Sequence, residues 1–216
     1  MEVAIKLLVE LFKTTKAFWF VLLGAGIAIF AHYKTSKLAL DREIQERKSK
    51  QYQETKKDKI DALKQLYELI HEITSIYTIY MSKVKYKICR KQRSSLTNDV
   101  EELRLFIVEN ISKASMLVQF YAIEKNVTFN HFQQSISKGL GFWDTYQLVQ
   151  IKDKKGKKDK NYLDRLSKAH LELIDKNAIR VSQYEFALTF RIGSQGRNIL
   201  RSNDPYVEEL EQIKIA

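Results

Sequence analysis

The sequence predicts a mainly α-helical protein, and three observations support this prediction. One proline and seven glycines in 216 residues are too few for a sandwich or barrel with many tight turns. Hydrophobic residues make up 44% of the chain and charged residues 29%, which is the balance of a folded protein. Apolar residues recur in steps of three and four over residues 60–121, as they do in helices. We therefore expect an N-terminal single-pass membrane helix, a long stalk, an antiparallel helical hairpin, and a C-terminal helical segment with a small β-hairpin.

Residues 1–16 form a broadly apolar stretch with a narrow charged stripe. The stripe residues are spaced by four, four and three positions, and they are Glu2, Lys6, Glu10 and Lys13. This pattern predicts an amphipathic interfacial helix that lies in the headgroup plane of a membrane. The alternative is that several copies of the chain line a pore with their stripes.

Residues 17–33 are predicted to cross a membrane. No charge occurs between Ala17 and Ala31, and Trp19 and Tyr33 suit the two interfaces. A helix of this length reaches about 25 Å, which is less than a hydrocarbon core of about 30 Å, so the flanking lysines must snorkel or the bilayer must thin. The alternatives are a cleaved signal peptide and a buried core helix.

Small residues within this predicted span indicate self-association. Gly24 and Ala28 have the four-residue spacing that lets transmembrane helices approach each other closely. We therefore expect a homo-oligomer, with the lipid bilayer as the other partner.

The distribution of basic residues predicts the orientation of the span. Three lysines precede it and six basic residues follow within about twenty positions, namely Lys6, Lys13 and Lys16, then Lys34, Lys37, Arg42, Arg47, Lys48 and Lys50. The C-terminal body is therefore expected on the cytoplasmic side of the inner (cytoplasmic) membrane. The single cysteine, Cys89, agrees with a reducing compartment and excludes an internal disulfide and a cysteine-rich metal site. No cofactor is expected.

After the span, residues 34–59 read as a charged, solvated stalk, and residues 60–124 as an antiparallel helical hairpin. The first apolar seam is Ile60, Leu63, Tyr67, Ile70, Thr74, Tyr77, Met81, Val84 and Ile88. The second is Val100, Leu103, Ile107, Ile111, Ala114, Val118 and Tyr121. A short connection favours pairing of these seams within one chain, and the alternative is pairing with another copy.

Residues 125–216 are predicted to form an α-helical module with a β-hairpin. Residues 128–138 and the stretch from Leu163 to Ile174 favour helices, whereas residues 141–151 are ambiguous. From Tyr184 to Ile192 apolar residues alternate with others, which predicts a half-buried strand, and a short strand at 179–181 would pair with it. Asp204 and Pro205 are typical of a helix start.

The order of helix, short strand, turn and longer strand in residues 163–200 resembles the end of a winged-helix domain. The resemblance rests on residues 163–177, 179–181 and 184–190 and on the segment 196–200 that follows. It implies DNA binding through the helix, but the helix mixes Arg165, Lys168 and Lys176 with three acidic residues. Such mixed charge is poor for phosphate contact.

Two clusters are candidate anion sites, as suits a chain with 37 basic and 26 acidic residues and a net charge of +11. The first contains Lys83, Lys85, Lys87, Arg90, Lys91 and Arg93. It is either a site for an acidic lipid, a nucleic acid or a small anionic ligand, or a solvated helix end where cations are favourable. The second is the glycine-containing turn from Arg191 to Arg197, where backbone amides and guanidinium groups would cradle a phosphate, and its alternative is a plain loop after a strand.

Arg165 and His170 give an arginine, four residues, histidine pattern. This pattern resembles the ribonuclease motif of the helical HEPN family, although Leu166 replaces the polar residue expected after the arginine. The resemblance implies acid–base chemistry by His170, charge stabilisation by Arg165, and a dimer.

Taken together, these patterns favour a non-enzymatic, membrane-anchored effector or sensor. Its body would bind a protein partner or a small anionic ligand and would perturb the membrane through clustered spans, as in bacterial or phage defence and exclusion systems. The alternatives are a membrane-tethered HEPN-like ribonuclease and a passive membrane scaffold or adaptor.

Overall fold

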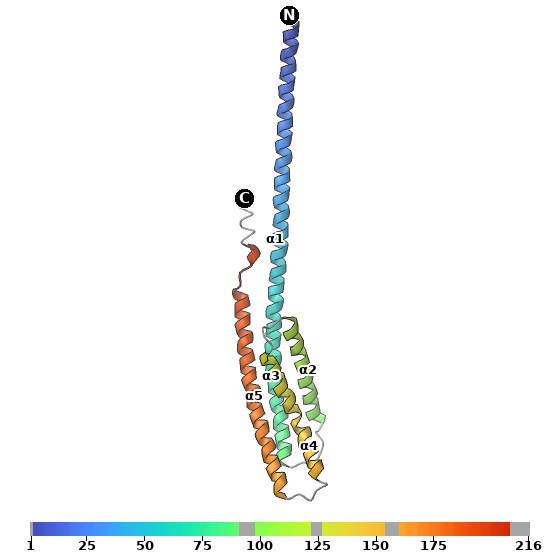
Figure 1. The fold of residues 1–216 in the computed structure, drawn as a ribbon, viewed down its shortest axis with the longest axis vertical. Coiled ribbons are helices and arrows are strands. Elements are labelled where there is room, and N and C mark those ends of the chain that lie inside the picture. The colour runs from blue at the N-terminus through green and yellow to red at the C-terminus, as the bar shows by residue number, and fades with distance from the viewer. Residues whose placement is uncertain (1, 91–97, 122–126, 154–159, 208–216) are drawn as a thin grey trace. The chain divides into compact units, whose positions relative to one another are not determined.

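The computed structural model describes residues 2–90, 98–121, 127–153 and 160–207, and all regular elements among them are α-helices (Figure 1). They are α1 (Glu2–Cys89), α2 (Asn98–Phe120), α3 (Val127–Leu140), α4 (Phe142–Asp153) and α5 (Lys160–Arg201). The prediction of a mainly helical chain with a long apolar N-terminal helix is therefore confirmed.

The chain divides into two compact units, and α1 contributes to both. One unit contains Met1–Thr55 and Asn203–Ala216, and the other contains Lys56–Ser202. We call the second unit the body. Each unit is described by itself below.

The core of the body is built on one broad face of α1. Leu66, Ile70, Ile73 and Tyr80 are at most 1% exposed, and they lie among the other buried residues of the 63–88 stretch. The buried face is wider than the predicted seam, because a helix in a globular core buries three or four positions in each two turns. Tyr67, which the seam includes, is instead 46% exposed.

Contacts between α1 and α2 run in opposite directions along the two helices. Lys83 near the end of α1 forms an ion pair with Asp99 at the start of α2. Eleven residues back on α1, Glu72 accepts a hydrogen bond of 3.3 Å from Asn110, which is eleven residues further along α2. Val100, Ile107, Ala114 and Val118 of α2 are buried, as are their counterparts on α1. The two helices are therefore antiparallel neighbours.

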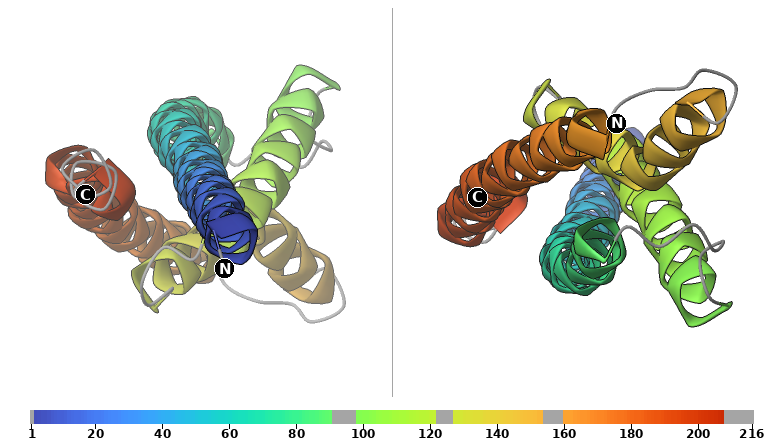
Figure 2. Two further views of the ribbon diagram at one scale, coloured as in Figure 1. Left: turned by 90° about the horizontal axis from the view of Figure 1, so that it is seen from above. Right: turned by 90° about the horizontal axis from the view of Figure 1, so that it is seen from below.

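Helices α3, α4 and α5 complete the body (Figure 2). The Asn177 side chain of α5 donates hydrogen bonds to Tyr77 Oη of α1 at 2.6 Å and to the Ser135 carbonyl of α3 at 2.8 Å. Tyr146 of α4 lies 3.1 Å from the Ser167 hydroxyl of α5. One core therefore joins all these helices.

The predicted β-hairpin is wrong, because residues 160–201 form the single helix α5. The buried residues Ile174, Val181, Leu188 and Ile192 recur at helical spacings. Phe186 and Phe190 imitate a strand pattern because they lie on the opposite, exposed face of the same helix, at 74% and 64% exposure. Without the two strands, the resemblance to a winged-helix domain no longer holds.

In the other unit, the segment after α5 lies against the stalk part of α1. Asp204 is only 9% exposed and accepts hydrogen bonds from Ser49 at 2.7 Å and from Gln53 at 3.0 Å. The Tyr206 ring packs edge-on against Tyr52 with 6.3 Å between centroids. The Tyr206 amide donates to Asp204 Oδ1 at 2.9 Å, as in a helix N-cap.

Candidate functional site

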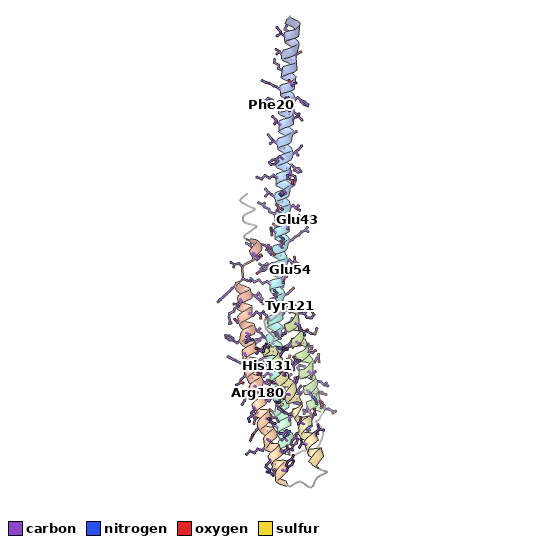
Figure 3. The ribbon with its side chains drawn as sticks, in the orientation of Figure 1. Phe20, Glu43, Glu54, Tyr121, His131 and Arg180 are labelled. Carbon is purple, nitrogen blue, oxygen red and sulfur yellow. The ribbon has the colours of Figure 1, made fainter. Side chains whose placement is uncertain are left out.

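The most distinctive surface of the described chain is an apolar segment of α1. Every described side chain from Phe18 to Tyr33 is exposed, with Phe20 at 73% (Figure 3). An 18-residue window of this helix near the N-terminus reaches a mean hydropathy of 1.3, and none of that window is buried. By length and composition the helix can cross a membrane. Its exposure does not fit the alternative of a buried core helix.

The small residues of this segment lie on two opposite faces. A shallow hollow is centred on Gly26 and is lined by Trp19, Leu22, Leu23, Ile27 and Phe30. Gly24 and Ala28, the pair favoured from the sequence, lie on the other side of the helix, because two residues correspond to about 200° of rotation. No atom lies within 4 Å of a Cβ built on Gly24 or on Gly26, so either position has room for a side chain within one copy. The hollow at Gly26 is a feature that the spacing argument missed.

The charged leader is continuous with this segment. Lys6, Glu10 and Lys13 are exposed, whereas the side chain of Glu2 lies outside the described residues. Helix α1 runs from Glu2 through Lys16 into the apolar segment without interruption. Its position on or in a membrane stays a prediction.

Two lysines of the first predicted anion cluster form ion pairs on opposite sides of α1. Lys83 pairs with Asp99 of α2, and Lys85 pairs with Asp175 of α5 at 2.5 Å. Both lysines are about two fifths exposed, at 40% and 38% of the side chain. Each therefore already has a carboxylate partner.

The remaining described members of that cluster pack against aromatic rings. Lys87 is 6% exposed and its Nζ lies 5.6 Å from the centre of the Trp143 ring. The guanidinium of Arg90 lies 4.5 Å from the centre of the Tyr86 ring. Such cation–π contacts stabilise the fold. Lys91 and Arg93 lie outside the described residues. The structure does not bring the described members together into one cradle.

The second predicted anion site is not a turn. Arg191 and Arg197 are exposed residues of α5, with Gly193 and Gly196 between them on the same helix. Amides in a helix interior donate to carbonyls four residues earlier, so they are not available to hold a phosphate. The predicted loop is therefore wrong.

The candidate ribonuclease pair does not converge. Arg165 is exposed, whereas His170 is 7% exposed and packs edge-on against the Tyr146 ring with 5.4 Å between centroids. His170 Nδ1 lies 3.1 Å from the Leu166 carbonyl, to which it donates. Five residues on a helix differ by about 140°, so the two side chains face different directions. The described geometry gives His170 a packing role.

A groove of about 670 Å³ lies between α1 and α5, and the sequence did not reveal it. The hydroxyl groups on its α1 wall donate to carbonyls four residues earlier, at 3.0 Å for Thr74, 2.8 Å for Thr78 and 2.9 Å for Ser82. The α5 wall includes Ile179 and Phe186. The groove is therefore mostly apolar, although Ser182 and Gln183 of α5 also line it.

Two tyrosines of α1 are buried in the core of the body, and one of them, Tyr77, also lines this groove. Burial raises the pKa of Tyr77 well above its ordinary value, although the hydrogen bond from Asn177 opposes the shift. Burial likewise raises the pKa of Tyr80 to about 12, and Arg104 opposes that shift. Tyr80 Oη donates to the Leu140 carbonyl at 3.1 Å. Both phenols are held neutral, which is a feature of the core rather than of a catalytic centre.

Comparison with known proteins gives no relative, since no protein-family model, no curated protein and no solved structure matches the chain. Within the described ranges, no group of three or more His, Cys, Asp or Glu side chains has an arrangement that would hold a metal ion.

Proposed function

We propose that this protein is a single-pass membrane effector or sensor, with a helical body on the cytoplasmic side of the inner membrane. The observation that supports the proposal is the fully exposed apolar segment from Phe18 to Tyr33 at one end of α1. An apolar surface of this extent is rare on a soluble monomer and marks contact with a membrane or a partner.

The length of α1 supports a membrane crossing. Residues 17–33 alone span about 25 Å, and the uninterrupted helix from Glu2 supplies further apolar turns before them. Snorkelling of the flanking lysines or local thinning of the bilayer lets this span match a hydrocarbon core of about 30 Å. Lys13 and Lys16 lie near one end of the segment, and Lys34 follows at the other.

The excess of basic residues after the span supports a cytoplasmic body. Lys34 and Lys37 are exposed, and neither forms an ion pair with a described residue. Charges of this kind resist transfer across a membrane.

Covalent continuity supports the effector mechanism. The same helix that carries the apolar segment supplies the core of the body through residues such as Ile70 and Tyr77. Binding of a partner or small anionic ligand to the body would change the position of α1. The clustered spans that belong to the same helices would then perturb the bilayer. This would suit a defence or exclusion system of a bacterium or phage.

Permeability of the inner membrane tests the proposal. The full chain is expressed in bacteria, and dye entry and growth are compared for the parent and for Gly24→Leu and Gly26→Leu. Each leucine fills one face of the span without a clash inside one copy. We expect at least one of them to abolish dye entry while the protein remains in the membrane fraction. Ala25→Leu is the matched control, because it adds a similar volume between the two faces.

Three results would contradict parts of the proposal. Parent protein without any effect on permeability or growth would favour the passive scaffold. Toxicity that is lost in His170→Ala and also in Arg165→Ala, with the body still folded by circular dichroism, but kept in both glycine variants would favour the ribonuclease. Digestion of the body by protease added outside intact cells would overturn the cytoplasmic location.

A further inference from the structure

The outer face of α5 is unexpectedly apolar. Four residues on it are large and exposed, namely Ile179 at 59%, Phe186 at 74%, Phe190 at 64% and Leu200 at 62%. They lie opposite the buried stripe of α5, because Val181, Leu188 and Ile192 point to the core. We call these four residues the α5 patch. All four are exposed within one body, and Ile179 and Phe186 also line the open side of the groove between α1 and α5.

Helix α2 carries a second exposed apolar stripe. It contains Leu105 at 68%, Val108 at 52%, Met116 at 56% and Phe120 at 77% exposure. Helical spacing places these four residues within about 120° of one another, away from the buried Ile107 and Ala114. We call them the α2 patch. Figures 1 and 2 agree that α2 and α5 lie on opposite sides of α1 within the body.

The two patches have complementary charge. Arg180, Arg191, Arg197 and Arg201 are exposed around the α5 patch, and none of them forms an ion pair with a described residue. Around the α2 patch the exposed acidic residues are Glu102 and Glu109, of which Glu109 pairs with Lys113 at 2.7 Å. Two α5 patches would bring arginines together, whereas α5 against α2 pairs opposite charges.

Helices α2 and α5, which carry the two patches, also match in chain direction and in position along α1. Lys83 and Lys85, two residues apart on α1, bind Asp99 of α2 and Asp175 of α5. Higher on α1, Glu72 binds Asn110 of α2 and His71 lies 2.8 Å from Glu185 of α5. Both helices therefore run in the same direction along the same part of α1. Copies held in one membrane with the same orientation can place α2 of one beside α5 of the next without inversion.

We propose that a second copy of this chain docks its α2 patch on the α5 patch, and that this contact repeats from copy to copy. The inference rests on the proposed membrane anchor, which keeps copies parallel and raises their effective concentration. Because the two surfaces differ, the contact is heterologous and builds a ring or an open row rather than a closed pair. The bodies would thereby hold several spans together.

Cysteine crosslinking of the full chain in native membranes tests this contact. The exposed Cys89 is first replaced by serine. Met116→Cys and Phe190→Cys are then combined in one chain, because these residues lie at similar heights on the two patches. Mild oxidation should give a ladder of dimers, trimers and larger species. A negative control combines Phe190→Cys with Thr145→Cys, an exposed position on α4, and should give no ladder.

A charge exchange sharpens the test. Arg180→Glu in the double-cysteine chain should reduce the ladder several-fold, and adding Glu102→Arg should restore it. A dimer formed by Phe190→Cys alone would show symmetric α5 pairing and would overturn the inference. So would the absence of a ladder, as expected if the basic face lies against anionic lipid.

Failure of the inference and failure of the proposed function are distinguishable in the same membranes. Gly24→Cys and Gly26→Cys, each in the Cys89→Ser background, report contact between spans on the two faces that carry the small residues. Span crosslinks and dye entry without a body ladder would overturn this inference and leave the proposed function standing. Loss of membrane association would overturn the proposed function itself.

Discussion

Two regions of the single helix α1 are both rich in apolar residues but differ in how those residues are distributed around the helix. From Phe18 to Tyr33 apolar side chains occupy all faces and every described one is exposed. From Leu63 to Ile88 most apolar side chains lie on one broad face and are buried, while the other face is mixed and carries charged residues such as Lys64 and Glu68. The angular distribution of apolar residues, rather than their number, therefore indicates which solvent a helical segment meets.

The energetic consequences of the two regions differ accordingly. Burying a large aliphatic or aromatic side chain contributes about 1.5–3 kcal/mol. In the 63–88 region this contribution stabilises the body, because the covering helices belong to the same chain. In the 18–33 region the same contribution is available only from lipid or from another chain. Residues 18–33 should thus govern the location of the protein, and residues 63–88 should govern the folding of the body.

A charged residue placed at the centre of each region should give the largest difference between the effects on membrane association and on folding. Leu23→Arg should remove the protein from the membrane fraction, since an arginine at the centre of a span costs about 2.5–3.5 kcal/mol on insertion scales. The thermal unfolding of the body should remain as in the parent. Ile70→Arg should instead prevent folding of the body, because Ile70 is 0% exposed and has no room for a charge.

Membrane fractionation and circular dichroism during heating measure both effects. Ile70→Ala provides a milder variant that still folds, with an expected loss of about 2–5 kcal/mol. A lower melting temperature for the body of Leu23→Arg would contradict the separation of roles, as would release of Ile70→Ala from membranes.

Much of the fold was predictable because α1 and α2 repeat apolar residues at helical spacing over many turns. The same logic failed in α5, where Phe186 and Phe190 on the outer face alternate with Leu188 and Ile192 on the inner face. Two apolar faces on one helix produce a period of two that local sequence cannot distinguish from a strand. Only packing against the rest of the body decides between them.

The candidate sites were less predictable than the fold. The run Lys83, Lys85 and Lys87 reveals a concentration of positive charge in the sequence. It does not reveal that the first two lysines pair with Asp99 and Asp175, or that the third packs on Trp143. Those partners come from other helices. The hollow at Gly26 and the groove between α1 and α5 likewise depend on shape rather than on spacing.

Gly139→Ala should give the next largest effect, and it acts only on the packed region of α1. A Cβ at Gly139 of α3 would overlap the Tyr77 hydroxyl and would lie 2.6 Å from the ring carbon that bears it. Since Tyr77 is 1% exposed and bound by Asn177, its ring cannot move freely. We expect a loss of about 1–3 kcal/mol in the free energy of unfolding, measured with denaturant.

Gly196→Ala in α5 is the control for this prediction. No atom lies within 4 Å of a Cβ built there, so the extra methyl group meets open space. Alanine is the better helix former, and we expect a gain of about 0.5–1 kcal/mol. Equal effects of the two alanines would show that close packing at Tyr77 has no special role.

Alkaline pH should weaken the packed region but not membrane association. Burial raises the pKa of Tyr77, and that of Tyr80 to about 12, above the ordinary value of about 10 in the unfolded chain. The neutral phenols therefore contribute stability that is complete below pH 10 and is lost as the pH rises through the folded pKa. The free energy of unfolding should fall by up to about 1.4 kcal/mol per pH unit for each tyrosine.

Denaturant titrations at a series of alkaline pH values, followed by the ultraviolet absorbance of tyrosinate, measure this fall. Tyr80→Phe should make the slope shallower, at a cost of about 0.5–1.5 kcal/mol near neutral pH from the lost hydrogen bond to Leu140. Tyr86→Phe removes the hydroxyl group of an exposed tyrosine and should leave the slope unchanged. An unchanged slope in Tyr80→Phe would contradict the assignment.

The smallest effect should come from the charged face of the packed region. Lys85→Gln breaks the ion pair with Asp175, but both side chains are substantially exposed, at 38% and 56%. Water and salt screen such a pair, so we expect a loss below about 1 kcal/mol that shrinks further at high ionic strength. A larger loss that salt does not reduce would mean that the groove beside Lys85 excludes water. The groove would then be a third kind of surface on α1, besides the buried core face and the solvent-exposed face.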